Sequence, residues 1–298
     1  MTECFFEFLK EQDVKYIRSY NLSLKSTIGI GGECKALLLP KSLGQLIKIL
    51  EFLVSTKIKF KVLGGMSNVL INDEGFDGII IKTTNISKYC VAESQIVAEC
   101  GVMLPRMIFD LSLHSIGGFS ELYGIPASIG GAIYNNAGAY GKSIEDVFVS
   151  ASVYSLSDGK IYEFDKCNMK FSYRESVLKN SPLILLSARF SYELTDEFLI
   201  RKRLSDVLGE RKTKQPYDKK SLGSVFKRHG GEPISKIIDE LGLKGFSIGG
   251  AEISKKHAGF IINRENATAE DVKKIIEYVK ERVYASRGFV PEEEIEYI

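Results

Sequence analysis

Apolar side chains recur with two different periods along the chain, and the period changes several times. Between residues 42 and 56 the spacing is helical, and residues 58–62 then alternate as a strand does. Short apolar runs at 69–71 and 79–81 follow across a turn-prone stretch. These elements predict a compact α+β unit that ends near Thr84.

The middle of the chain predicts a second α+β domain. Strand-like apolar runs lie at residues 147–149 and 183–186. A basic segment at 201–216 follows, and its composition suits an exposed helix that leads into a linker. Such a run can attract an anionic substrate, but it is more often a solvated helix face. We therefore expect a domain boundary near residue 200.

The last third predicts two helices with clear ends and one terminal strand. The first helix lies within 233–242, between a proline near its start and a glycine stop. The second lies within 268–288, where Thr268 and Asp271 resemble a capping box and a glycine ends the apolar stripe. Residues 294–298 alternate as a strand does.

Composition and charge narrow the class of protein. The chain has 298 residues and a net charge of +2, which does not favour nucleic acid or a membrane surface as the main partner. Five scattered cysteines without a C-x-x-C pair favour a reduced chain, and neither a signal peptide nor a membrane-length apolar run is evident. We therefore expect a cytoplasmic protein. The three histidines lack metal-ligand spacing, so no metal site is expected.

Two glycine-containing segments are the strongest functional signal. Residues 124–141 combine glycines, small residues and amides, and residues 64–68 place two glycines directly after a predicted strand. Glycine lets backbone N–H groups approach a ligand closely, so both segments favour an extended dinucleotide cofactor. Asn135 or Asn136 can bond the edge of a heterocycle, with Ser128 as a further donor. The alternatives are a plain tight turn at 64–68 and close-packed turns at 124–141.

Three further positions are weaker candidates. Arg174 follows Tyr173, a pair that can bind a carboxylate while the ring packs on substrate, although a lone arginine is usually a surface residue. Ser224 lies between a glycine and an apolar pair, where a hydroxyl can donate a proton or simply cap a turn. A serine-hydrolase nucleophile is not expected, because no histidine and aspartate accompany it in a recognisable context. Glu294 by itself is an ordinary surface carboxylate.

In order along the chain, these segments resemble the UDP-N-acetylenolpyruvoylglucosamine reductase (MurB) family over essentially the whole sequence. The resemblance rests on family motifs that recur here in the family's order: Thr27–Gly32, Gly64–Asn68, Gly124–Gly141, Tyr173–Ser176, Lys214–Pro216, Gly223–Lys227, His257–Asn263 and Glu294–Ile298.

The resemblance implies a three-domain α+β flavoprotein of the vanillyl-alcohol-oxidase (PCMH) type with a C-terminal substrate-binding α+β domain. It implies FAD-binding subdomains at 1–84 and 85–200 and a UDP-sugar domain at 201–291, with a C-terminal strand, 292–298, that returns to the first. Only about fifty residues separate the arginine and serine motifs, which matches the shorter, type II form of the family.

The resemblance also implies site residues. FAD is expected on two sets of positions: Gly64, Gly65, Met66, Ser67 and Asn68, and Gly124, Ile125, Pro126, Ser128, Gly131, Asn136, Ala137 and Gly138. Substrate is expected on Tyr173, Arg174, Gln215 and Lys227. Ser224 matches the family's proton donor, and Arg174 and Glu294 match the residues that polarise the substrate carboxylate.

The implied reaction reduces UDP-N-acetylglucosamine enolpyruvyl ether to UDP-N-acetylmuramate, with NADPH as hydride donor to FAD, in peptidoglycan precursor synthesis. A monomer is expected. Residues 226–229 read F-K-R-H where the family usually has F-K-N-P or F-K-R-P, a departure that concerns substrate contacts. Two rivals stay open. One is another FAD enzyme, an oxidase of a small alcohol or sugar, and the other is a catalytically silent binder of uridine nucleotides.

Overall fold

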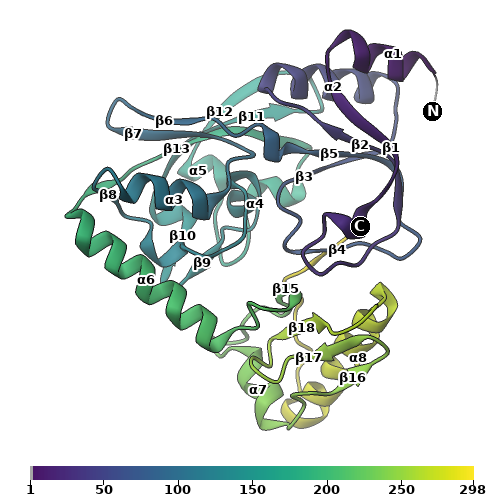
Figure 1. Cartoon of the computed structure of the whole chain (residues 1–298), viewed down its shortest axis with the longest axis vertical. Helices are drawn as coiled ribbons and strands as arrows, with labels where there is room; N and C mark the ends of the chain where they lie inside the picture. The colour runs from purple at the N-terminus through teal and green to yellow at the C-terminus, as the bar shows by residue number, and fades with distance from the viewer. Residues whose placement is uncertain (1–2) are drawn as a thin grey trace. The chain divides into compact units, whose positions relative to one another are not determined.

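The buried apolar side chains form two separate cores, and each core belongs to one unit of the chain. The computed structural model describes residues 3–298 (Figure 1). The first unit comprises residues 1–19, 35–65 and 78–209, and the second comprises 20–34, 66–77 and 210–298. Two short N-terminal segments are therefore built into the unit that contains the C-terminus. The expected division into domains at residues 84 and 200 stays a prediction.

A four-stranded sheet carries one half of the first core. Its strand order is β1-β2-β5-β3, and β3 and β5 run parallel. Ser42 caps the helix that packs there, since its hydroxyl accepts a hydrogen bond from the Gln45 N–H, and this matches the helix predicted from residue 42. The elements are α1 (Glu3–Glu11), β1 (Lys15–Asn21), β2 (Glu33–Leu39), α2 (Leu43–Ser55), β3 (Phe60–Leu63) and β5 (Phe76–Lys82).

A five-stranded antiparallel sheet carries the other half, in the order β12-β11-β13-β7-β6. Short helices and two small ribbons, β10-β9 and β14-β8, surround it. Its strands are β6 (Tyr89–Ala92), β7 (Gln95–Glu99), β11 (Phe148–Ser155), β12 (Ile161–Asp165) and β13 (Leu183–Phe190). The other elements are α3 (Leu104–Ser112), β8 (Ile116–Gly117), α4 (Ile129–Tyr134), β9 (Gly138–Ala139), β10 (Lys142–Ser143), α5 (Lys166–Met169) and β14 (Glu193–Leu194).

The basic segment forms α6 (Glu197–Lys214), a helix longer than the sequence indicated. It spans both the expected domain boundary near residue 200 and the boundary between the two units after residue 209. No helix within residues 3–298 has the length and apolar character that crossing a membrane requires.

The second unit is built on an antiparallel sheet of order β15-β18-β17-β16, with α8 lying against β16 and β17 (Figure 1). The Thr268 hydroxyl accepts from the Asp271 N–H and the Asp271 carboxylate accepts from the Thr268 N–H, so the predicted capping box is confirmed. The elements are β15 (Lys220–Ser224), α7 (Ile234–Glu240), β16 (Ser247–Ile248), β17 (Ala251–Ile253), β18 (Phe260–Asn263) and α8 (Ala269–Arg287).

The chain ends in a strand that returns to the N-terminal part of the sequence. Strand β19 (Glu296–Tyr297) runs parallel to β4 (Val69–Leu70), inside the second unit. The strand predicted over 294–298 is therefore shorter than its alternation indicated. Asp73, just beyond β4, accepts hydrogen bonds from the Ala269 and Glu270 N–H groups at the start of α8.

Candidate active site

The two glycine-containing segments meet at Gly64 and Gly65, which belong to the first unit. A Cβ on Gly64 would lie 2.0 Å from Oγ of Ser128, and a Cβ on Gly65 would lie 3.1 Å from O of Pro126. Ser128 is 1% exposed and caps α4, because its Oγ accepts a hydrogen bond from the Gly131 N–H at 3.3 Å. Both positions thus require glycine because residues 126 and 128 lie so close to their backbone. A plain tight turn at residues 64–68 would not by itself require this.

The loop of residues 64–68 leaves backbone donors available. It connects the end of β3 to the start of β4, so its residues belong to neither strand. Within residues 3–298, the N–H groups of Gly65, Met66, Ser67 and Asn68 donate no hydrogen bond. Successive unpaired N–H groups in a loop are a common way to bind phosphate oxygens.

The helix α4 inside the glycine-rich segment was not predicted, and it separates the roles of two asparagines. Asn136 is 3% exposed, its Nδ2 donates to O of Ser172 at 3.0 Å, and its Oδ1 accepts from the Glu145 N–H at 3.2 Å. Its side chain is therefore used within the fold. Oδ1 of Asn135 is buried and has no hydrogen-bond partner among residues 3–298. Asn135 is thus the better placed of the two side chains to bind a ligand.

The turn that carries Arg174 is held to the glycine-rich segment by three hydrogen bonds. Ser172 and Glu175 form an isolated antiparallel bridge, and Arg174 between them has φ +60°. That conformation usually selects glycine in a turn, and a bulky residue that adopts it marks a constrained position. Nη2 of Arg174 donates to O of Gly138 at 3.0 Å, Oγ of Ser176 donates to O of Tyr134 at 2.9 Å, and Asn136 supplies the third bond.

The remaining positions expected to bind FAD lie in the same segment of the first unit. Gly124 has φ +84°, so a side chain there would be strained. A Cβ on Gly138 would lie 2.8 Å from O of Lys142. The Ala137 N–H donates to O of Ala132, which closes the end of α4, and the Ile125 N–H donates to O of Leu122.

In the second unit, the structure brings Ser224 close to Glu294 through the backbone. Gly223 has φ +82° at an irregularity in the β15–β18 pairing, and Ser224 follows opposite Phe260. The next residue, Val225, accepts a hydrogen bond from the Glu294 N–H at 2.8 Å. Oγ of Ser224 forms no hydrogen bond within residues 3–298, which leaves this hydroxyl available to a ligand.

The expected substrate residues fall in both units. Tyr173 is 48% exposed beside Arg174 in the first unit. Lys227 in the second unit is nearly buried, its N–H donates to O of Glu292 at 2.9 Å, and its ammonium forms an ion pair with the Glu292 carboxylate. Gln215 follows α6, with its N–H donating to O of Arg211 at 2.7 Å.

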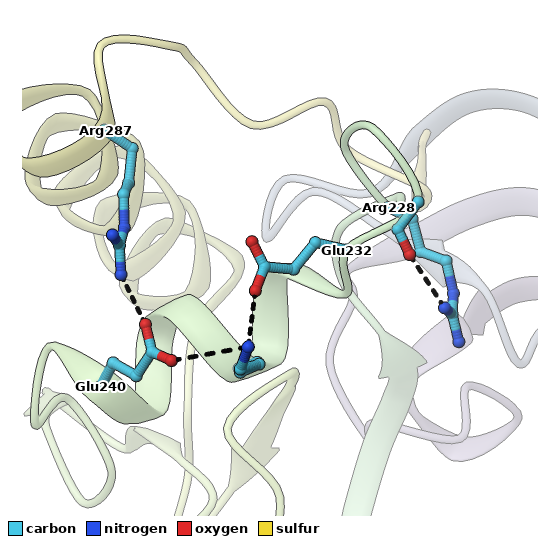
Figure 2. Close-up of polar contacts among 6 residues, drawn as sticks. Arg228, Glu232, Glu240 and Arg287 are labelled. Carbon is cyan, nitrogen blue, oxygen red and sulfur yellow. Dashed lines mark hydrogen bonds and ion pairs between the residues drawn. The ribbon is translucent and has the colours of Figure 1, made fainter.

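A small hairpin directly follows Lys227, at the residues where the sequence departs from the pattern of the family that it resembles. His229 and Glu232 form its bridge, and Nη1 of Arg228 donates to O of Gly231 at 3.1 Å (Figure 2). The imidazole of His229 stacks on the ring of Phe289, with 3.7 Å between centroids and 7° between planes. The unusual histidine therefore has a packing role.

Charged side chains support this hairpin from α7. Glu232 accepts a hydrogen bond from Lys236, which also lies 3.8 Å from Glu240, and Glu240 pairs with Arg287 at the end of α8 (Figure 2). The Lys236 ammonium lowers the pKa of Glu232, chiefly through their hydrogen bond. These groups are exposed, so each pair contributes little to stability.

Polar contacts also anchor the C-terminal segment, residues 292–298. The Lys280 ammonium of α8 pairs with the Glu293 carboxylate at 2.5 Å. The Tyr297 hydroxyl donates to the same carboxylate, and burial together with this bond raises the pKa of Tyr297. Sequence reasoning missed these anchors because nothing local marks a pair such as Lys280 and Glu293. No cluster of three or more potential metal ligands occurs within residues 3–298.

Comparison with known proteins decides the family. Residues 34–165 match the model of an FAD binding domain, and residues 215–298 match that of the UDP-N-acetylenolpyruvoylglucosamine reductase C-terminal domain. A UDP-N-acetylenolpyruvoylglucosamine reductase of Caldicellulosiruptor saccharolyticus is 39% identical over 292 residues, which cover 97% of this chain and 94% of that protein. One of Caldanaerobacter subterraneus subsp. tengcongensis is 37% identical over 97% of this chain and 96% of its own.

The chain belongs to the UDP-N-acetylenolpyruvoylglucosamine reductase family. The crystal structure of the Thermus caldophilus enzyme covers 95% of this chain and 98% of its own, with a TM-score of 0.81 and 29% identity. The resemblance to the shorter form of the family and the predicted fold class, an α+β flavoprotein of the vanillyl-alcohol-oxidase (PCMH) type with a C-terminal α+β domain, are thereby confirmed. Family membership makes the chain an FAD-binding oxidoreductase.

Proposed function

We propose that this protein reduces UDP-N-acetylglucosamine enolpyruvyl ether to UDP-N-acetylmuramate, with FAD as cofactor and NADPH as the electron donor, in peptidoglycan precursor synthesis. Homology over nearly the whole chain supports the reaction class. The observation that carries the proposal for the chemistry is the pairing of residues 225–227 with residues 292–294, because it holds Glu294 beside Ser224.

The residues of the two glycine-containing segments, 64–68 and 124–141, fit FAD. The close approach of Gly64 and Gly65 to Pro126 and Ser128 leaves backbone where side chains would otherwise stand, and the neighbouring N–H groups are unpaired. These groups would hold the pyrophosphate, and residues 124–138 would line the rest of the cofactor. When bound, FAD would supply a hydride, derived from NADPH, to the terminal vinyl carbon of the substrate.

The protein side chains then handle charge and one proton. Reduction at the vinyl carbon leaves negative charge on the adjacent carbon, spread into the carboxylate. Arg174 and Glu294 bind and polarise that carboxylate, with Glu294 acting in its protonated form as a hydrogen-bond donor, which lowers the energy of the charged state. The Ser224 hydroxyl donates a proton to the adjacent carbon and completes the reduction. Tyr173, Gln215 and Lys227 bind the UDP-sugar. We propose further that the enzyme acts as a cytoplasmic monomer that requires neither nucleic acid nor a membrane.

A two-step anaerobic experiment tests the proposal. The purified protein is reduced with one equivalent of NADPH, and the enolpyruvyl ether is then added while flavin absorbance is followed. Reoxidation with formation of UDP-N-acetylmuramate is the expected result. Ser224→Ala should slow this second step by about 10²-fold or more without changing the first, since general acid catalysis typically contributes that much.

Two outcomes would replace the proposal. Reduced flavin that ignores the enol ether, yet reoxidises in air with release of peroxide, would identify an oxidase. Colourless protein that binds uridine nucleotides and takes up no FAD would identify a silent binder.

A further inference from the structure

The side chain of Asn68 holds the backbone of Glu294. Nδ2 of Asn68 donates to O of Glu294 at 2.9 Å, and O of Asn68 accepts from the Glu296 N–H at 2.9 Å. One residue therefore binds both sides of Ile295, across 226 positions of sequence. Asn68, Glu294 and Ser224 all belong to the second unit.

Glu294 lies in a gap between two paired stretches. Glu293 before it forms an isolated bridge with Phe226, and β19 begins only at Glu296. The Glu294 N–H donates to O of Val225, and the Glu294 carbonyl accepts from the Asn68 amide, so both of its backbone groups are held. Because the Cα–Cβ bond leaves the backbone between N–H and C=O, fixing both groups fixes the direction in which the Glu294 side chain starts.

We propose that Asn68 is a positioning residue for Glu294, acting through its side-chain amide, while only its backbone N–H faces the cofactor. The inference rests on the proposed function of Glu294. An asparagine suits this role because its Nδ2 donates to a carbonyl, whereas an aspartate of the same shape has no donor. Asn68 thereby joins the loop of residues 64–68 to the residue that polarises the substrate.

The test compares Asn68→Asp and Asn68→Ala with the control Asn72→Ala. Oδ1 of Asn72 binds Lys273 of α8, and its N–H binds O of Ile298, so the control removes a similar side-chain bond away from Glu294. FAD content, the visible spectrum and the rate of reduction by NADPH are measured in all three variants, so that reoxidation is compared only between flavin-loaded proteins. Reoxidation by the enolpyruvyl ether should slow by about tenfold in the two Asn68 variants and stay unchanged in the control.

A double variant separates positioning from an independent contribution. In Asn68→Asp combined with Glu294→Ala, reoxidation should be no slower than in Glu294→Ala alone, because the amide acts only through the side chain that alanine removes. Multiplied effects would overturn the inference. A second outcome would also overturn the inference: Asn68→Asp loses FAD, but the protein that keeps FAD is reoxidised at the wild-type rate. The Asn68 side chain would then be a cofactor ligand.

Hydrogen exchange tests the contact without any substrate. In Asn68→Asp, amides of residues 294–298 should exchange faster than in the wild type and in Asn72→Ala. Unchanged exchange would refute the anchoring of residues 294–298 by the Asn68 side chain, and this result does not depend on which substrate the enzyme reduces. If wild-type protein fails to turn over the enol ether while exchange does accelerate, the proposed function is wrong but the contact stands.

Discussion

Replacing Gly64 with alanine should disrupt the contact between the two glycine-containing segments. The added Cβ would lie 2.0 Å from Oγ of Ser128, which is 1.4 Å short of the 3.4 Å at which ordinary contact begins. Ser128 is buried, so its hydroxyl has no open space to enter, and rotating it away breaks the cap on α4. Lost capping of about 1 kcal/mol and overpacking of about 1–3 kcal/mol together predict a loss of about 3 kcal/mol.

Urea unfolding followed by circular dichroism, with FAD affinity measured by fluorescence, checks this estimate. Gly44→Ala is the control, because the nearest atom to a Cβ there is 4.0 Å away in the first turn of α2, and alanine should stabilise that helix slightly. Adding Ser128→Ala to Gly64→Ala should recover part of the loss by removing Oγ. Wild-type stability and FAD affinity in Gly64→Ala, or strictly additive losses in the double variant, would refute the steric argument.

Three further predictions concern the frame around the site. In urea titrations, Asn136→Ala should lower the free energy of unfolding by about 2–4 kcal/mol, because two buried hydrogen bonds are lost. Asn135→Ala should change the free energy of unfolding little. Equal effects of the two substitutions would contradict the different roles given to the two asparagines. Asp73→Ala should cost about 1–2 kcal/mol by removing an acceptor at the start of α8, and unchanged thermal unfolding would count against this cap. Burial, aided by Lys244, lowers the pKa of His257, so the imidazole binds a proton more readily in the unfolded chain than in the folded one. The free energy of unfolding should therefore fall as pH drops below 6.5, and His257→Gln should weaken this pH dependence. The same pH dependence in His257→Gln and the wild type would contradict the prediction.

Local chemistry in the sequence was enough to predict elements with strong end signals. The helix ending at Gly288 was predicted from a capping box and a regular apolar stripe, and both are present. Helix α4 was missed because Gly130 and Gly131 have poor helix propensity, and the buried Ser128 cap and tertiary packing outweigh it. Its short length left no periodic pattern to detect.

The candidate site was predictable as a set of motifs but not as a set of contacts. Glycine density at residues 64–65 indicated close approach, yet only the structure identifies Ser128 as the neighbour. The bond from Asn68 to Glu294 joins residues too far apart for any spacing rule. Family resemblance supplied Glu294 as a candidate, because a carboxylate near the end of a chain carries no physical signal of its own.

The pairing of β19 with β4 has a consequence for how the chain folds while it is being synthesised. Ile28, Ile30 and Leu70 belong to the core of the second unit, but most of that core is made of residues after 220. During synthesis these N-terminal side chains must wait for about two hundred further residues before they can be buried. A fragment that begins at residue 210 would lack them, together with the partner strand of β19. Expression of residues 210–298 alone should therefore give aggregation-prone protein. A fusion that adds residues 20–34 and 66–77 to this fragment should be needed to complete the core of the second unit.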